Sequence, residues 1–145
     1  MNFKKHTSMH LVKGEDLNHH GTLFAGRTAE WFVETGFIAA ASVTKPENIV
    51  CLKIHGMTFT RPINKGDLVT FTSRVVLTGR TKIVVYVEVI VDEKVVVEGF
   101  ITFVHVDLDG RPLPHNLDFV PATAEEKALY EEAKKIVIDQ RDSGQ

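Results

Sequence analysis

Residues 22–43 read TLFAGRTAEWFVETGFIAAASV, a run without proline that is rich in alanine and aromatic residues. This composition favours one long helix, and Thr22 is a candidate for its N-terminal cap. Apolar side chains lie at almost every angle around the expected helix rather than along one stripe. A helix that is apolar on all sides is usually buried, so the sequence predicts a helix at the centre of the fold.

The residues that follow this helix have the pattern of β-strands. β-branched residues recur in period two for almost the whole stretch from residue 49 to residue 106. The breaks within this stretch are short enough to join antiparallel neighbours, so we expect a meander. Another strand is expected ahead of the helix. The predicted strands cover residues 5–12, 49–60, 68–77, 82–91 and 95–106.

The C-terminal part of the chain predicts a second helix. Thr123 and Glu126 have the spacing of a capping box, which opens a helix at about residues 122–141. Its apolar residues fall on one stripe, so this helix must pack against another element. The stripe consists of Leu129, Ala133, Ile136 and Val137.

These elements combine into an α+β architecture. A buried helix and a long meander both cover their apolar surfaces if the antiparallel sheet curls around the helix, with the C-terminal helix added outside. The length of 145 residues suits one domain, so we expect residues 1–145 to form a single unit. One sheet around one helix leaves edges open, and pairing of two subunits is the expected remedy.

Composition and charge exclude several classes of protein. The formal net charge is −2, so no overall field attracts nucleic acid or an anionic membrane, and no apolar run is long enough to cross a bilayer. Cys51 is the only cysteine, which rules out an intramolecular disulfide and a zinc site of several thiolates. We expect its thiol to lie in the core. The N-terminus lacks the apolar stretch of a secretory signal, so the expected location is the cytoplasm.

Two motifs flank the central helix. Residues 18–26 follow the pattern Asn-x-x-Gly-x-x-Phe-x-Gly, and residues 59–67 follow Phe-x-Arg-Pro-x-x-x-Gly-Asp. In this order, with a strand before them and the buried helix between them, they resemble the hotdog-fold acyl-CoA thioesterases over residues 9–113 or so. The closest group is that of the bacterial short- to medium-chain enzymes and the brain-type acyl-CoA hydrolases.

The resemblance implies a fold, a reaction and an assembly. The fold is the hotdog, and the reaction is hydrolysis of acyl-CoA to a free acid and coenzyme A. Coenzyme A is then part of the substrate, and no separate cofactor or metal is expected. The closest relatives imply a homo-oligomer with a dimer as its unit and a hexamer, a trimer of dimers, as its assembly.

Thioester hydrolysis requires an activated water, a hydrogen-bond donor for the oxyanion and a groove for the pantetheine arm. Free amides near Ala25 and Gly26, at the positive end of the helix, are candidate oxyanion donors. The family usually has Gly-Gly here, and Ala25 replaces the first glycine. Alternatively, these small residues only allow close packing of helix and sheet. Asn18 matches an asparagine of the family that positions water or the thioester oxygen, but it also suits a turn that bonds its own backbone.

The position of the usual catalytic acid differs in this chain. Many members carry Asp or Glu seven residues after the second glycine, where this sequence has Val33. Glu34 follows, rotated by about 100° around the helix, and we predict it to be the general base. Covalent catalysis, in which this carboxylate attacks the thioester and forms an anhydride, is an alternative mechanism. Glu30 shares a face with Glu34, so both are candidates to border one cavity, although for Glu30 we favour a structural contact with Arg27 or a neighbouring subunit.

Coenzyme A itself is expected to contact the segment after the helix. Residues 78–82 resemble the family's glycine-threonine hairpin near the pantetheine. The resemblance implies substrate-binding roles for a set of residues whose basic members would pair with phosphates, although each basic side chain alone also suits a solvated surface position. The set is Ala25, Arg61, Arg80, Thr81 and Lys82.

Other readings of the sequence remain. His19 and His20 are adjacent, but no carboxylate or third histidine lies at the spacing of metal ligands, so we predict no metal site. A hotdog hydratase or dehydratase requires a paired acid and histidine, and no matching motif surrounds His55 or His105. The third reading is a non-catalytic acyl-CoA-binding protein, which Val33 favours. No DNA-binding segment accompanies the predicted domain, which weakens a role of such a protein as a regulator.

Overall fold

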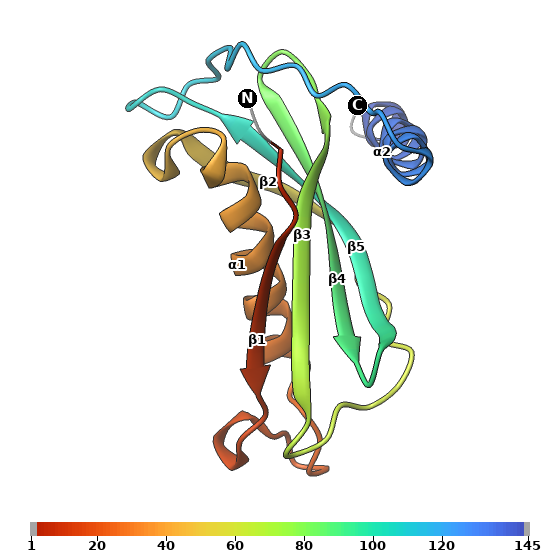
Figure 1. The fold of residues 1–145 in the computed structure, drawn as a ribbon. Coiled ribbons are helices and arrows are strands. Elements are labelled where there is room, and N and C mark those ends of the chain that lie inside the picture. The colour runs from red at the N-terminus through yellow and green to blue at the C-terminus, as the bar shows by residue number, and fades with distance from the viewer. Residues whose placement is uncertain (1–2, 144–145) are drawn as a thin grey trace.

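An antiparallel sheet of five strands curls around one helix, and a second helix lies outside the sheet (Figure 1). This computed structural model describes residues 3–143, with side chains through residue 137. The arrangement confirms the predicted α+β architecture. None of the helices in the described part of the chain is long and apolar enough to span a membrane. The elements are β1 (His6–Leu11), α1 (Ala25–Ser42), β2 (Ile49–Gly56), β3 (Leu68–Thr78), β4 (Lys82–Val91), β5 (Lys94–His105) and α2 (Ala124–Ser143), with short 3₁₀ turns at Gly14–Asp16 and Pro46–Asn48.

The strand order is β1-β3-β4-β5-β2, so the meander is only partly as predicted. β3, β4 and β5 form it, but β2 pairs with β5 rather than with the strand that follows it in sequence. The expected pairing across residues 61–67 is therefore wrong. Gly56 and Met57 have φ angles of 86° and 106°, which end β2 four residues before the expected boundary at residue 60. Residues 57–67 then cross from the β2 edge of the sheet towards the opposite edge, where β3 lies next to β1.

β2 is an open edge of the sheet. It has a partner strand on one side only, and most of its residues are exposed. Cys51 is among them, so the expectation of a thiol in the core is wrong. Exposed apolar side chains line this edge strand, with exposed fractions of 47% for Val50, 49% for Leu52 and 40% for Ile54. An apolar open edge is a natural surface for pairing with another strand.

Helix α1 begins at Ala25, three residues later than Thr22. Thr22 forms an isolated bridge with Asn64 and Leu23 forms one with Leu17, so both residues are held in extended chain and Thr22 caps nothing. Phe24 occupies the N-cap position without a side-chain cap bond. The helix start is consequently tied to two loops, one before it and one after β2.

One face of α1 packs on the sheet and the opposite face is open. Gly36 allows the close approach, because a Cβ there would lie 2.7 Å from Cδ1 of Ile101. Glu30, Glu34 and Ile38 are exposed, so the prediction of a helix buried on all sides is wrong for the single chain. The buried residues of α1 are Thr28, Phe32, Thr35, Gly36, Ala39 and Ala40.

Helix α2 corresponds to the second predicted helix, and its capping box is present. The Thr123 hydroxyl accepts the N–H of Glu126 at 3.1 Å, and the Glu126 carboxylate accepts the N–H of Thr123 at 3.0 Å. Its apolar stripe packs on the outer face of the sheet, where it completes a small second core. The sheet residues of that core are Val76, Val84, Tyr86 and Phe100.

Candidate active site

The loop before α1 is organised by the side chain of Asn18. Its Oδ1 accepts the N–H groups of His20 at 2.8 Å and Thr22 at 3.2 Å, and its Nδ2 donates to the Thr22 hydroxyl at 3.0 Å. These are the bonds that the turn interpretation predicts. Nδ2 keeps one hydrogen without an acceptor among residues 3–143. A catalytic role of Asn18 stays a prediction.

The start of α1 carries two free amides. The N–H of Phe24 donates to the Asp16 carbonyl oxygen at 2.9 Å, and the N–H groups of Arg27 and Thr28 donate to the Phe24 carbonyl at 2.9 and 3.2 Å. The N–H groups of Ala25 and Gly26 have no acceptor in the described part of the chain. We call this pair the helix-start amides. They lie at the positive end of the helix dipole and suit a carbonyl oxygen that gains negative charge.

Gly26 leaves room for an aromatic ring over the helix start. A Cβ at this position would lie 2.5 Å from Cε2 of Phe24, and its nearest neighbours are all atoms of that ring. The close contact of Gly26 is thus with the Phe24 ring and not with the sheet, which argues against the alternative that Gly26 allows close packing of helix and sheet. Phe24 is 56% exposed, so its ring forms part of the surface beside the helix-start amides.

The acidic residues of α1 lie on its open face. Glu30 is 3.6 Å from the guanidinium of Arg27, which confirms the predicted structural contact. Glu34 is exposed, whereas Val33 is partly buried against the main core. Neither carboxylate is enclosed in the single chain, so the expectation of two carboxylates around one cavity is not met there. The assignment of Glu34 as base stays a prediction.

Sequence reasoning missed Asp16. It is only 4% exposed, and its Oδ1 lies 3.4 Å from Nε of Arg27 in the first turn of α1. Its Oδ2 accepts the N–H of Lys13 at 2.9 Å. The sequence shows here only a polar turn, and nothing in that turn indicates that one of its two acids is buried.

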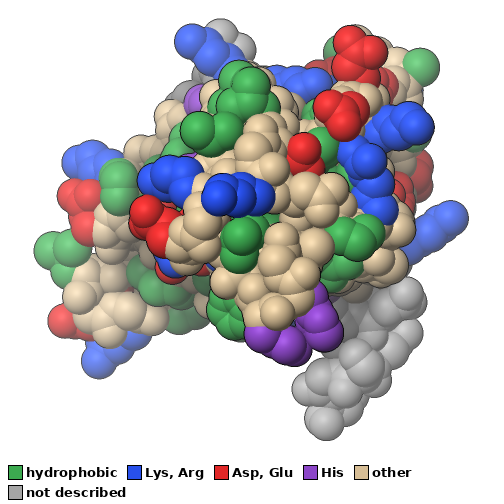
Figure 2. All heavy atoms as spheres, turned by 90° about the horizontal axis from the view of Figure 1, so that it is seen from below, with side chains coloured by type: hydrophobic (Ala, Val, Ile, Leu, Met, Phe, Trp, Pro, Cys, Tyr) green, Lys and Arg blue, Asp and Glu red, His purple; other side chains and the backbone are tan. Residues whose placement is uncertain are grey.

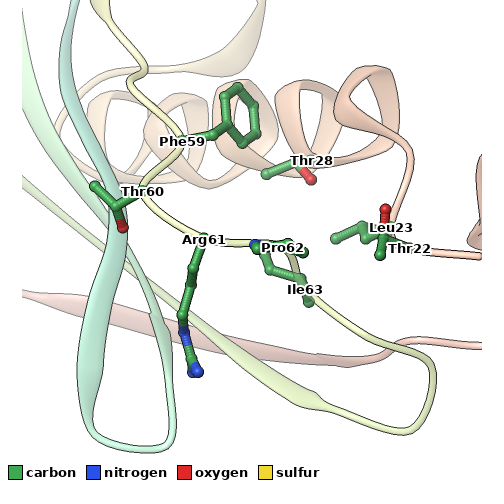
Figure 3. A pocket seen from close by; sticks show the side chains of 8 residues that line it. All are labelled: Thr22, Leu23, Thr28, Phe59, Thr60, Arg61, Pro62 and Ile63. Carbon is green, nitrogen blue, oxygen red and sulfur yellow. The ribbon is translucent and has the colours of Figure 1, made fainter. Parts of the chain in front are cut away.

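A pocket of about 380 Å³ lies between the start of α1 and the segment after β2 (Figure 3). Figure 3 shows Arg61 extending away from it. Its Nη2 donates to the Val91 carbonyl at 3.2 Å and lies 3.6 Å from Asp92, so the guanidinium is held at the β4–β5 turn. The role of Arg61 in substrate binding stays a prediction. The pocket is lined by Thr22, Leu23, Thr28, Phe59, Thr60, Arg61, Pro62 and Ile63.

The remaining predicted coenzyme A contacts lie at the other end of the sheet. Arg80, Thr81 and Lys82 belong to the β3–β4 hairpin, where the Thr81 carbonyl accepts the N–H of His105 at 2.7 Å. In Figure 1 this hairpin is at the top, while α1 begins at the bottom. One chain therefore does not bring these residues to the helix-start amides.

The lower end of the molecule shows no uniformly basic surface. Figure 2 views this end and shows basic, acidic and apolar side chains interspersed, with histidines near one margin. Within the described residues, no three His, Cys, Asp or Glu side chains are grouped to hold a metal ion. His19 and His20 are exposed, with ring centroids 3.9 Å apart.

Neither His55 nor His105 lines the pocket. His55 Nε2 lies 2.8 Å from the Thr102 hydroxyl, and burial lowers the pKa of its imidazole, with the charge of Lys53 lowering it further. His105 Nδ1 lies 2.7 Å from the Leu113 carbonyl. The hydratase reading gains no support from this geometry.

Comparison with known proteins yields consistent matches. Residues 20–98 match the profile of the Thioesterase superfamily. A cytosolic acyl coenzyme A thioester hydrolase of Rattus norvegicus is 31% identical over 144 residues, which is 92% of this chain but 37% of that protein. An uncharacterised acyl-CoA thioester hydrolase of Bacillus subtilis is 32% identical over 81% of this chain and 71% of its own length. The crystal structure of an apo-hexameric acyl-CoA thioesterase superposes with a TM-score of 0.85 at 29% identity, over 97% of this chain and 92% of the other.

Proposed function

Because the chain belongs to the Thioesterase superfamily, we propose that it hydrolyses acyl-CoA thioesters to a free acid and coenzyme A. The observation that carries the proposal is the pair of helix-start amides beside a pocket, in a chain similar to acyl-CoA thioester hydrolases. The proposal treats residues 1–145 as a single hotdog domain. A cytoplasmic location is supported by the similarity to a cytosolic hydrolase.

The proposed reaction is attack of water on the thioester carbonyl. The N–H groups of Ala25 and Gly26 hold the developing oxyanion, and the second Nδ2 hydrogen of the Asn18 side chain orients the water or the thioester oxygen. Glu34 accepts the proton of the attacking water as general base. This role of Glu34 is supported by its exposed position on the helix that carries the amides. Attack by the carboxylate itself, through an anhydride, is the variant of this mechanism.

We propose a homo-oligomer whose dimer completes the site. Three features support it: the open apolar edge of β2, the open face of α1, and the distance of the β3–β4 hairpin from the helix start. In the oligomer, Arg80, Thr81 and Lys82 of one chain bind the coenzyme A whose thioester lies at the helix-start amides of another. The similarity to a hexameric acyl-CoA thioesterase supports a hexamer built as a trimer of dimers.

A second candidate function is non-catalytic binding of acyl-CoA. It is favoured by one observation, the partly buried Val33 at the place of the usual catalytic acid. The two candidates differ in turnover but not in ligand, so binding measurements alone do not separate them.

Release of free thiol from acyl-CoAs of increasing chain length tests the proposal. The protein is first treated with a chelator, and calorimetry with coenzyme A is measured in parallel. Thiol release with saturation supports hydrolysis, whereas binding without release supports the non-catalytic candidate. Activity that is lost on chelation and restored by zinc contradicts the metal-free mechanism. Light scattering tests the assembly, and a stable, active monomer at micromolar concentration contradicts the shared site.

A further inference from the structure

We infer that Asp16 is a positioning residue for the helix-start amides, an inference that rests on the proposed hydrolysis. Among the described residues, Asp16 is the one charged side chain that is buried, with 4% exposure. A carboxylate loses its hydration on burial, so it persists only where its contacts compensate. The contacts of Asp16 converge on the start of α1.

Asp16 holds the chain on both sides of the helix-start amides. Its carbonyl oxygen accepts the N–H of Phe24 at 2.9 Å, directly before Ala25 and Gly26. Its carboxylate lies 3.4 Å from Nε of Arg27, directly after them. One residue outside the helix thus fixes the two positions that flank the amides.

Asp16 is itself anchored and is not placed to act as a base. Its Oδ2 accepts the N–H of Lys13 at 2.9 Å, which closes the Gly14–Asp16 turn. Leu17 then pairs with Leu23 in an isolated bridge, which brings the turn against the helix start. The negative charge lies at the positive end of the helix dipole and beside a guanidinium, and both interactions favour it.

The consequence for turnover follows from geometry. Amide donors stabilise an oxyanion only when they are held at about 2.7–3.1 Å from it, and a displacement of about 1 Å can cost about 100-fold in rate. Asp16→Asn keeps an acceptor for the Lys13 N–H but loses the charge attraction to Arg27. We expect kcat to fall by about 10- to 100-fold while KM changes little, since the contacts to coenzyme A lie elsewhere.

The test compares Asp16→Asn with Arg27→Gln, the double variant and two matched controls. Glu30→Gln removes the other, exposed carboxylate on Arg27. Asp107→Asn alters a similar turn after β5, in which the carboxylate accepts the N–H groups of Asp109 at 2.9 Å and Arg111 at 3.0 Å. We expect the first two variants to lower kcat alike and the double variant to add little. Both controls should retain wild-type kcat.

Hydrogen exchange of the peptide that covers residues 24–28 provides a readout independent of turnover. Positioning predicts faster exchange of this peptide in Asp16→Asn and Arg27→Gln than in either control, while exchange of the central strands stays unchanged. If Asp16→Asn does not fold, Arg27→Gln carries the same prediction. Equal kcat and equal exchange in these variants and the controls overturn the inference. If the wild type releases no thiol, hydrolysis itself is wrong, and the exchange data still decide whether Asp16 holds the helix start.

Discussion

Gly99 lies at the most crowded backbone contact among the glycines described, and its replacement by alanine should destabilise the fold. A Cβ on Gly99 would lie 2.7 Å from the backbone oxygen of His55, 3.2 Å from Cζ of Phe32 and 3.4 Å from the backbone N of Met57. Two of these three atoms belong to the backbone. They cannot rotate away as the end of a side chain can, because β2 is held to β5 by strand pairing at this point.

The size of the effect follows from this geometry. Adding a carbon to a packed site costs about 1–3 kcal/mol when the backbone must shift. A domain of this size loses about 3–4 °C in Tm for each kcal/mol, so Gly99→Ala should unfold about 3–12 °C lower than the wild type. Gly36→Ala meets the flexible end of Ile101 at 2.7 Å and gains helix propensity of about 1 kcal/mol, so a smaller change is expected.

Thermal unfolding followed by circular dichroism measures the effect, at one fixed protomer concentration because association shifts Tm. Gly14→Ala is the control, since nothing lies within 4 Å of a Cβ at that position. The expected order of destabilisation is Gly99→Ala, then Gly36→Ala, then Gly14→Ala. Equal melting temperatures for Gly99→Ala and the control would show that the contact of β2 with β5 is looser than the structure describes.

Three further predictions concern single side chains. Glu34→Gln should lower turnover by about 10²- to 10⁴-fold, whereas Glu30→Gln should lower it far less. Unchanged thiol release by a folded Glu34→Gln variant would refute the base assignment. Backbone N–H donors, that of Thr123 first, lower the pKa of Glu126 from 4.5, so its stabilisation of α2 is present above pH 4.5 and is lost as pH falls through the lowered value. The difference in melting temperature between wild type and Glu126→Gln should therefore be smaller at pH 4 than at pH 7. Burial raises the pKa of the Cys51 thiol, so alkylation near pH 7 should be slower in the native protein than in urea, and equal rates would contradict a raised thiol pKa in the fold.

Local patterns of the sequence predicted most of the secondary structure. Period-two alternation of β-branched residues placed β3, β4 and β5 nearly to their observed ends, because each of these strands is paired on both sides and must fill its inner face. The capping box at Thr123 likewise located the start of α2, since its hydrogen bonds involve only residues close in sequence.

The candidate site was predicted only in part. The small residues at the start of α1 pointed to the helix-start amides, whose freedom follows from the geometry of any helix start. The predicted meander placed β2 wrongly, because period two does not say which strand is the neighbour. The expectation of a buried Cys51 is wrong for the same reason, since β2 is an edge strand. The spacing of Glu30 and Glu34 gave their common face but not their solvent exposure.

The sequence by itself predicted the element types, the family resemblance and the candidates for the groups that carry the chemistry. Only the tertiary structure showed that Asp16 is buried, that Arg61 is held at the β4–β5 turn, and that the β3–β4 hairpin lies far from the start of α1. The physical reason is the range of the interactions. Propensity, periodicity and capping act over a few residues, whereas burial and ion pairing depend on segments that meet only when the sheet closes around the helix.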